Sequence, residues 1–417
     1  MATQNRMIRR FVAVTIALFI VFGIVADGPR SALEGFLRLQ VAPARLVSDF
    51  TVVAGPGAAF LNSAAVGIAG LIVLRLNKVQ LSGPTMATTF IMMGFALFGK
   101  TVLNIIPIIL GVTLAALIVG RKPSTYVLIA LFGTALAPLV SFIAFEMGFP
   151  FAIALPLSIA IGVLAGVILP PLAIAMLHLH QGYSLYNVGL TAGFIGLFAA
   201  SLPNAASIDI SAFTQWGTAS TPLLIAIVPI LSLVAIVMSL FGEGGIAKTM
   251  KQYLALLKLP GRLPSDFLDL AGEKGALFNA GTMGLAYSAF VALVGGSFNG
   301  PVVGALMTIL GFGFFGKHLR NALPIFLGVL LAALVFGKDI SQNWVIVAFL
   351  FSTGLSPLAG EFGTIVGMIA GFLLLVIVER TGSWHGGMNL YNVGFAGGLT
   401  ATLLVSVIEW YKTNVQR

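Results

Sequence analysis

Two stretches of the chain repeat each other closely: His180-Gln181-Gly182-Tyr183-Ser184-Leu185-Tyr186-Asn187-Val188-Gly189 and His385-Gly386-Gly387-Met388-Asn389-Leu390-Tyr391-Asn392-Val393-Gly394. Shorter matches accompany them, among them Ser48-Asp49-Phe50 with Ser265-Asp266-Phe267, and Phe98-Gly99-Lys100 with Phe315-Gly316-Lys317. From Arg45 to Leu117 the second copy follows at a constant offset, and small gaps shift it afterwards. The pattern indicates one unit present twice: a first repeat over 8–202, a connecting segment over 203–218 and a second repeat over 219–412.

Composition places the chain in a membrane. Hydrophobic residues make up 59% of it and charged residues 8%, whereas a soluble domain carries about 25% charged residues. The apolar runs lack the two-residue alternation of a barrel, so helices are expected to cross the bilayer. The chain has no cysteine, which excludes disulfides and thiolate metal sites. The first apolar run resembles a signal peptide but continues into an apolar chain, so we predict a retained first helix.

The net charge of +9 is typical of nucleic-acid binding as well as of membrane proteins. Basic residues that flank membrane helices set their orientation and contact anionic headgroups. We therefore expect membrane lipids as partners and no nucleic acid.

The distribution of basic residues predicts the orientation. Arg6, Arg9 and Arg10 precede the first apolar run, Lys412 and Arg417 follow the last, and no Lys or Arg occurs from 203 to 222. The positive-inside rule then places both termini in the cytoplasm and the connecting segment outside. Each unit crosses an odd number of times, so the repeats have inverted topology. We predict an all-α integral protein of the bacterial inner membrane, with about ten to twelve crossings and paired broken or re-entrant segments.

A short apolar segment recurs in both units. Gly83-Pro84 and Gly300-Pro301 each open such a segment, and Lys100 and Lys317 close it. A half-helix that begins within the membrane would point bare N–H groups at a pathway, whereas a full helix would begin at the surface. The lysines either line the route or snorkel to the surface.

Further polar residues are paired between the units. Asn62 and Asn279 either contact a polar solute or bond a neighbouring helix. The pairs Tyr186-Asn187 and Tyr391-Asn392 offer an aromatic wall and an amide to a small molecule, or else anchor and pack helices.

Residues suited to ion coupling form a separate set, and they compete with surface or packing roles. These are His180, His385, Thr134, Thr353 and Glu361. Pro138 and Pro357 mark a kinked helix near the threonines, and Glu146 occupies a position loosely equivalent to that of Glu361. We expect no metal site and no cofactor, and no catalytic constellation points to an enzyme.

The motif Phe60-x-Asn62-x-x-x-x-Gly67 resembles a helix-opening motif of the bacterial urea-transporter family. Leu-Tyr-Asn-Val-Gly is similar to that family's Leu-Tyr-Gly-Phe-Asn-Gly, although here one Asn replaces an Asn pair and the family's Pro is missing. The resemblance implies two inverted halves around a narrow pore. The whole chain is also similar to an uncharacterised family of bacterial membrane proteins, which implies no activity.

These patterns predict a channel or facilitator for a small polar solute, either a urea-like neutral molecule or a small anion, with its pathway between the repeats. One alternative is a proton- or sodium-coupled secondary transporter. Another is a non-transporting scaffold or receptor, in which the paired polar residues would pack against each other. Whether the protein forms a homo-oligomer is left open.

Overall fold

The computed structural model describes residues 6–207, 210 and 214–415. Part of the predicted connecting segment and Arg417 of the basic tail lie outside these ranges. The helices of the first unit are α1 (Arg6–Asp27), α2 (Pro29–Leu39), α3 (Phe50–Val53), α4 (Pro56–Leu76), α5 (Gly83–Phe95), α6 (Val102–Ile118), α7 (Val127–Gly133), α8 (Ala137–Phe145), α9 (Phe151–His180) and α10 (Asn187–Ala205).

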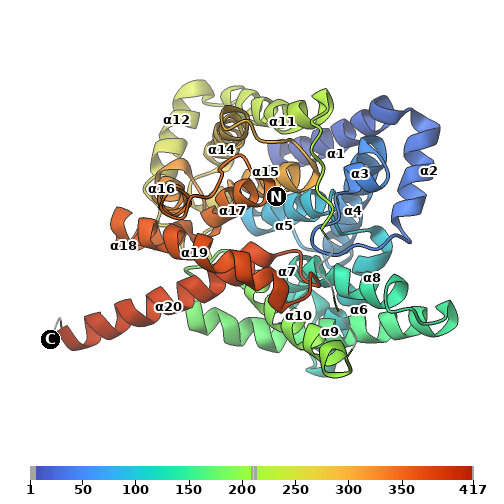
Figure 1. Ribbon diagram of the computed structural model, residues 1–417. Coiled ribbons are helices and arrows are strands. Elements are labelled where there is room, and N and C mark those ends of the chain that lie inside the picture. The colour runs from blue at the N-terminus through green and yellow to red at the C-terminus, as the bar shows by residue number, and fades with distance from the viewer. Residues whose placement is uncertain (1–5, 208–209, 211–213, 416–417) are drawn as a thin grey trace.

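The second unit runs through the same order of helices (Figure 1). They are α11 (Pro222–Leu240), α12 (Gly245–Leu256), α13 (Phe267–Leu270), α14 (Glu273–Leu293), α15 (Gly300–Phe312), α16 (Leu319–Val335), α17 (Asn343–Ser352), α18 (Ser356–Phe362), α19 (Thr364–Trp384) and α20 (Asn392–Val415). Short 3-10 turns, Thr134–Leu136 and Thr353–Leu355, join α7 to α8 and α17 to α18. The same local sequence signals therefore give the same elements twice.

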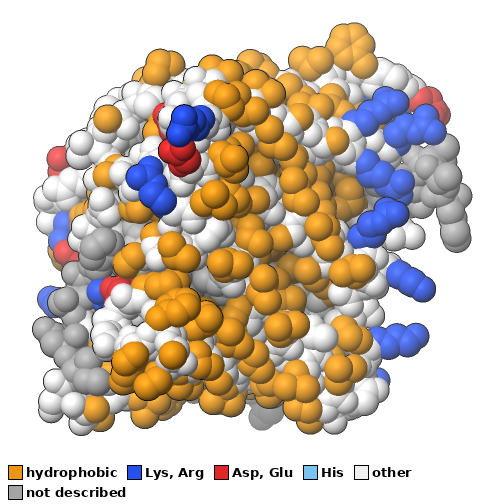
Figure 2. All heavy atoms as spheres, turned by 90° about the vertical axis from the view of Figure 1, so that its right-hand side faces the viewer, with side chains coloured by type: hydrophobic (Ala, Val, Ile, Leu, Met, Phe, Trp, Pro, Cys, Tyr) orange, Lys and Arg blue, Asp and Glu red, His pale blue; other side chains and the backbone are white. Residues whose placement is uncertain are grey.

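The prediction of an all-helical membrane protein is confirmed. Among the described residues, 10 helical segments are long and apolar enough to cross a membrane. Figure 2 shows hydrophobic side chains over a broad band of one face, with Lys and Arg gathered along one edge. Large apolar side chains such as Leu110, Leu114 and Leu117 are exposed, as expected of a surface that contacts lipid tails.

The short central helices also follow the prediction. α5 and α15 contain 13 residues each and begin at the Gly-Pro pairs. At 1.5 Å per residue each is about 20 Å long, which is less than the roughly 30 Å of a bilayer core. Gly99 and Gly316, with φ of 151° and 85°, turn the chain back towards the next helix.

The two units meet through equivalent helices. α5 packs on α15 and α10 packs on α20 near the centre of the molecule (Figure 1). Gly94 of α5 faces Gly304 of α15, and Ala87 faces Gly311. Gly94 and Gly311 are equivalent positions, as are Ala87 and Gly304, so each contact maps onto the other when the units are exchanged. The same contacts make α5 and α15 antiparallel.

Candidate functional site

Two cavities lie between the units, and equivalent residues line them. The first has a volume of about 560 Å³ and the second of about 340 Å³. Tyr391 lines both cavities. The equivalent pairs, with the residue of the first cavity given first, are Leu46 and Leu263, Phe98 and Phe315, Pro301 and Pro84, Val347 and Leu128, Phe351 and Phe132, and Asn392 and Asn187.

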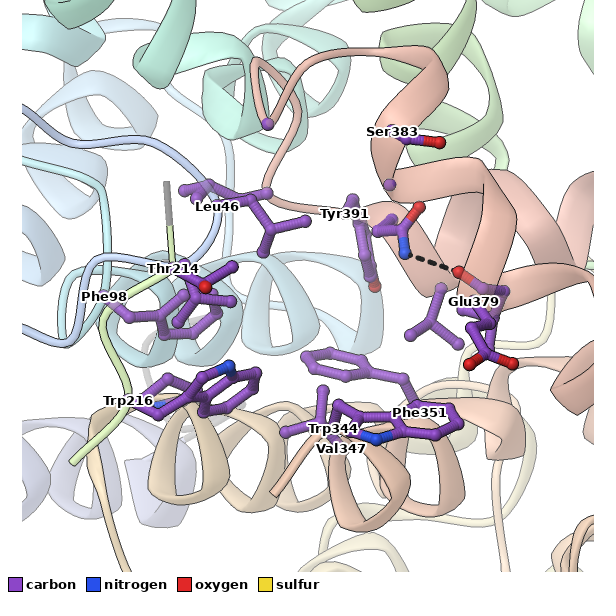
Figure 3. A pocket seen from close by; sticks show the side chains of 18 of the residues that line it. Leu46, Phe98, Thr214, Trp216, Trp344, Val347, Phe351, Glu379, Ser383 and Tyr391 are labelled. Carbon is purple, nitrogen blue, oxygen red and sulfur yellow. Dashed lines mark hydrogen bonds between the residues drawn. The ribbon is translucent and has the colours of Figure 1, made fainter. Parts of the chain in front are cut away.

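Several aromatic side chains line the first cavity (Figure 3). Figure 3 shows Tyr391 reaching down between Phe98 on one side and Glu379 on the other, with Phe351 below it. Trp216 and Trp344 complete the apolar wall. The walls can accommodate a small molecule, and they also carry side chains that can form hydrogen bonds, among them Thr214, Glu379, Ser383 and Asn392.

The half-helices open beside the cavities, with Pro84 at the second and Pro301 at the first. Their N–H groups are not bare, which corrects the prediction. The Gly83 N–H donates to both carboxylate oxygens of Asp266 at 3.0 Å, and the Gly300 N–H lies 3.3 Å from those of Asp49. Each aspartate belongs to the other unit, so it offsets the positive end of the partner's half-helix.

The lysines that follow the half-helices are buried. Lys100 and Lys317 are both 0% exposed, so neither snorkels to the surface. The two paired asparagines hold the turns that carry them. Asn62 Nδ2 donates to the carbonyls of Ala96 and Lys100 at 2.7 Å, and Asn279 Nδ2 makes the equivalent pair of bonds at 2.7 and 2.8 Å. Neither asparagine is among the residues that line the cavities.

Aromatic rings surround the two lysines in the same way. Lys100 Nζ lies 4.9 Å from the centroid of the Phe95 ring, and Lys317 Nζ lies 4.9 Å from that of Phe312. Tyr391 contacts Phe95 and Tyr186 contacts Phe312, each with ring centroids 5.1 Å apart. Between the lysines, the rings of Tyr186 and Tyr391 pack with centroids 4.5 Å apart.

Hydrogen bonding breaks this symmetry. Lys317 Nζ donates to the Tyr186 hydroxyl and, at 2.9 Å, to Thr353 Oγ1. Lys100 Nζ and the Tyr391 hydroxyl make no hydrogen bond of regular geometry with the described residues. In the described part of the chain, no ion pair joins either lysine to a carboxylate. The centre therefore holds two buried amines and no acidic partner for them.

The residues predicted for coupling have mainly structural contacts. His180 and His385 are buried at helix ends and lie 2.9 and 3.1 Å from the Oδ1 atoms of Asn187 and Asn392. The same amides donate to carbonyls of the preceding helices α9 and α19. The asparagines thus brace the starts of α10 and α20 while also lining the cavities.

The two threonines also have structural contacts, whereas the two glutamates lie in different environments. Thr134 and Thr353 donate to carbonyls three residues earlier, at 2.6 and 2.7 Å, within the 3-10 turns. Glu361 is exposed at the end of α18. Glu146 instead pairs with Arg45 at 2.8 Å. Burial raises the pKa of the Glu146 carboxyl, and the Arg45 guanidinium opposes that rise.

A family model described as "Protein of unknown function (DUF1576)" matches residues 28–205 and 246–410. The chain belongs to this family. That assignment confirms the similarity to an uncharacterised family, and the two matched stretches fall in the two units. No curated protein and no solved structure matches the chain. The resemblance to urea transporters therefore stays a prediction.

Sequence reasoning did not find several residues of the site. Asp49 and Asp266 lie in a repeated Ser-Asp-Phe motif, which signalled their pairing but not that each caps a helix of the other unit. Trp216, Trp344 and Glu379 line the first cavity without equivalents in the second, so no repeat marked them.

Proposed function

We propose that this protein carries a small polar solute across a membrane along a route between its two units. The observation that carries the proposal is the pair of equivalent cavities that share Tyr391. Two cavities built from equivalent residues are what a duplicated transporter needs to offer access from two sides. Tyr186 and Tyr391 are buried and their tilted rings pack against each other between the cavities, so the route is closed at its centre and needs a gate.

Inverted topology is part of this proposal, and contacts at the helix ends support it. Ile8 N, at the start of α1, donates to Glu273 Oε1 at 2.9 Å. Lys274 Nζ donates at 2.7 Å to the carbonyl of Phe241, which follows the end of α11. The start of α1 thus lies near the end of α11, and two spanning helices in this relation run in opposite directions. The cavities would then open towards opposite faces of a bacterial inner membrane, with both termini in the cytoplasm.

A coupled transporter is the second candidate, and the closed centre favours it over an open pore. A continuous pore would pass solute down its gradient only. A route blocked by two tyrosines next to buried lysines suits a cycle in which the gate opens to one side at a time.

Flux into proteoliposomes tests the proposal. A panel of urea, glycerol, chloride, nitrate and formate is compared in vesicles with and without the protein, and we expect at least one solute to cross faster with it. Tyr391→Ala widens the constriction and should raise that flux. Tyr411→Ala, at an exposed position of α20, is the matched control. A proton or sodium gradient that drives accumulation above equilibrium identifies coupling. Equal leak with and without protein, unchanged by Tyr391→Ala, refutes transport of these solutes.

Cysteine labelling tests the topology. The chain has no native cysteine, so a single Ala206→Cys or Asn414→Cys reports one exposed position. An impermeant maleimide applied to intact cells should label the first and not the second. Labelling of both positions from the same side would show that the repeats are not inverted.

A further inference from the structure

We propose that Lys100 and Tyr391 together bind a small monovalent anion, the solute class that the route would carry. This inference rests on the proposed transport function and names its substrate class. The site lies where α5 ends and α20 begins, beside the first cavity.

Two buried polar groups with incomplete hydrogen bonding mark the site. Lys100 is 0% exposed and Tyr391 is 1% exposed. Within the described structure, the Lys100 amine has no hydrogen-bond partner, and the Tyr391 hydroxyl has only the Tyr186 hydroxyl beside it, in a contact that lacks regular hydrogen-bond geometry. A buried polar group without a partner is costly, and a buried ammonium is more costly still. A ligand that accepts hydrogen bonds from both groups would satisfy them.

In the second unit, the equivalent lysine and tyrosine are hydrogen-bonded to each other. There, Lys317 Nζ bonds directly to the Tyr186 hydroxyl. The distances of lysine and tyrosine to the intervening phenylalanine, 4.9 and 5.1 Å, are the same in both units. Lys100 and Tyr391 both contact the Phe95 ring, as Lys317 and Tyr186 both contact the Phe312 ring. Among the described residues, however, only the second lysine forms a hydrogen bond with its tyrosine. An acceptor placed between Lys100 and Tyr391 would restore what the second unit has.

The charge of the site selects an anion over a neutral solute. A carbonyl oxygen would accept the hydrogen bonds but would not offset the cost of burying the charged form of Lys100, whereas an anion would. No described carboxylate forms an ion pair with Lys100. A halide, nitrate or short carboxylate supplies both the charge and the acceptor. Phe98 and Phe351 line the first cavity together with Tyr391, and they offer no charged group to a multiply charged ion.

Thermal unfolding in detergent tests binding directly. Sodium chloride, nitrate and formate are compared with sodium gluconate, whose anion is too large, at equal ionic strength. In the unmodified protein we expect the small anions to raise the apparent melting temperature as their concentration increases. Lys100→Met should weaken apparent anion affinity by about 30-fold or more. Lys122→Met removes an exposed lysine and should leave the response unchanged.

Two further variants distinguish a loss of anion binding from a folding defect. Tyr391→Phe removes one oxygen and should also weaken the response, and Lys100→Arg should retain part of it. An equal rise in the unmodified protein and in both weakening variants would overturn the site, as would no rise at all.

Flux measurements separate this inference from the proposed function. If urea or glycerol crosses but anions neither cross nor stabilise the protein, the anion site fails and transport stands. If anions stabilise the protein through Lys100 but no solute of the panel crosses, the site stands and transport of these solutes fails.

Discussion

Substituting the tyrosines of the central pair by phenylalanine should lower stability at Tyr186 but not at Tyr391. Tyr186 and Tyr391 occupy equivalent positions, and either substitution removes one oxygen from a buried ring. The Tyr186 hydroxyl accepts a hydrogen bond from Lys317. Its loss leaves that amine with Thr353 alone, and a buried bond of this kind contributes about 1.5–3 kcal/mol when the donor is charged.

The Tyr391 hydroxyl has no regular bond to lose in the described structure. Burying an unsatisfied hydroxyl costs about 1–3 kcal/mol on the scale of protein mutations. Tyr391→Phe should therefore leave stability unchanged or increase it by up to about that amount, while weakening the anion response. A hydroxyl retained at a cost in stability is expected where it binds a ligand.

Thermal unfolding of the two variants and the unmodified protein in the same detergent ranks their melting temperatures. We expect Tyr391→Phe to melt at or above the unmodified protein and Tyr186→Phe to melt below it. If Tyr391→Phe lowers the melting temperature as much as Tyr186→Phe does, the asymmetry at the centre is not real and the reasoning fails.

Two further sets of substitutions test the packing. A Cβ on Gly94 would lie 2.5 Å from the Gly304 carbonyl oxygen, so Gly94→Ala should push the half-helices apart and lower the melting temperature; Gly382→Ala, whose Cβ would have its nearest contact at 3.5 Å, is the control. Replacing either partner of the Arg45–Glu146 pair by Gln should cost up to about 3–5 kcal/mol, because the charge that remains loses its ionic partner in a mostly buried environment. Replacing both by apolar residues should cost less than either single change, and a double loss equal to the sum of the two single losses would show that the pairing contributes nothing.

Much of the fold was open to prediction because its signals are local. The length and apolarity of a run decide whether it crosses a bilayer, and Gly-Pro decides where α5 and α15 begin. The turns at Gly99 and Gly316 follow from glycine's tolerance of positive φ. These features depend on a few neighbouring residues, so the same short motifs in both units form the same secondary-structure elements.

The site was predicted less completely, since it depends on packing between the units. The sequence showed that Lys100 and Lys317 occupy equivalent positions. It did not show that both are buried, because a lysine at a helix end can reach the surface unless other helices cover it. The sequence likewise could not show that Asn62 holds the turn instead of facing a cavity.

The sequence by itself determined the class of the protein, its two equivalent units and the residues paired between them. Only the tertiary structure decided that Asp49 and Asp266 cap helices of the opposite unit, that equivalent cavities share Tyr391, and that Lys317 is bonded while Lys100 is not. The physical reason is that equivalent motifs specify equivalent local structure. Contacts between distant segments depend on the whole arrangement, and that arrangement leaves the two halves of the centre in different states.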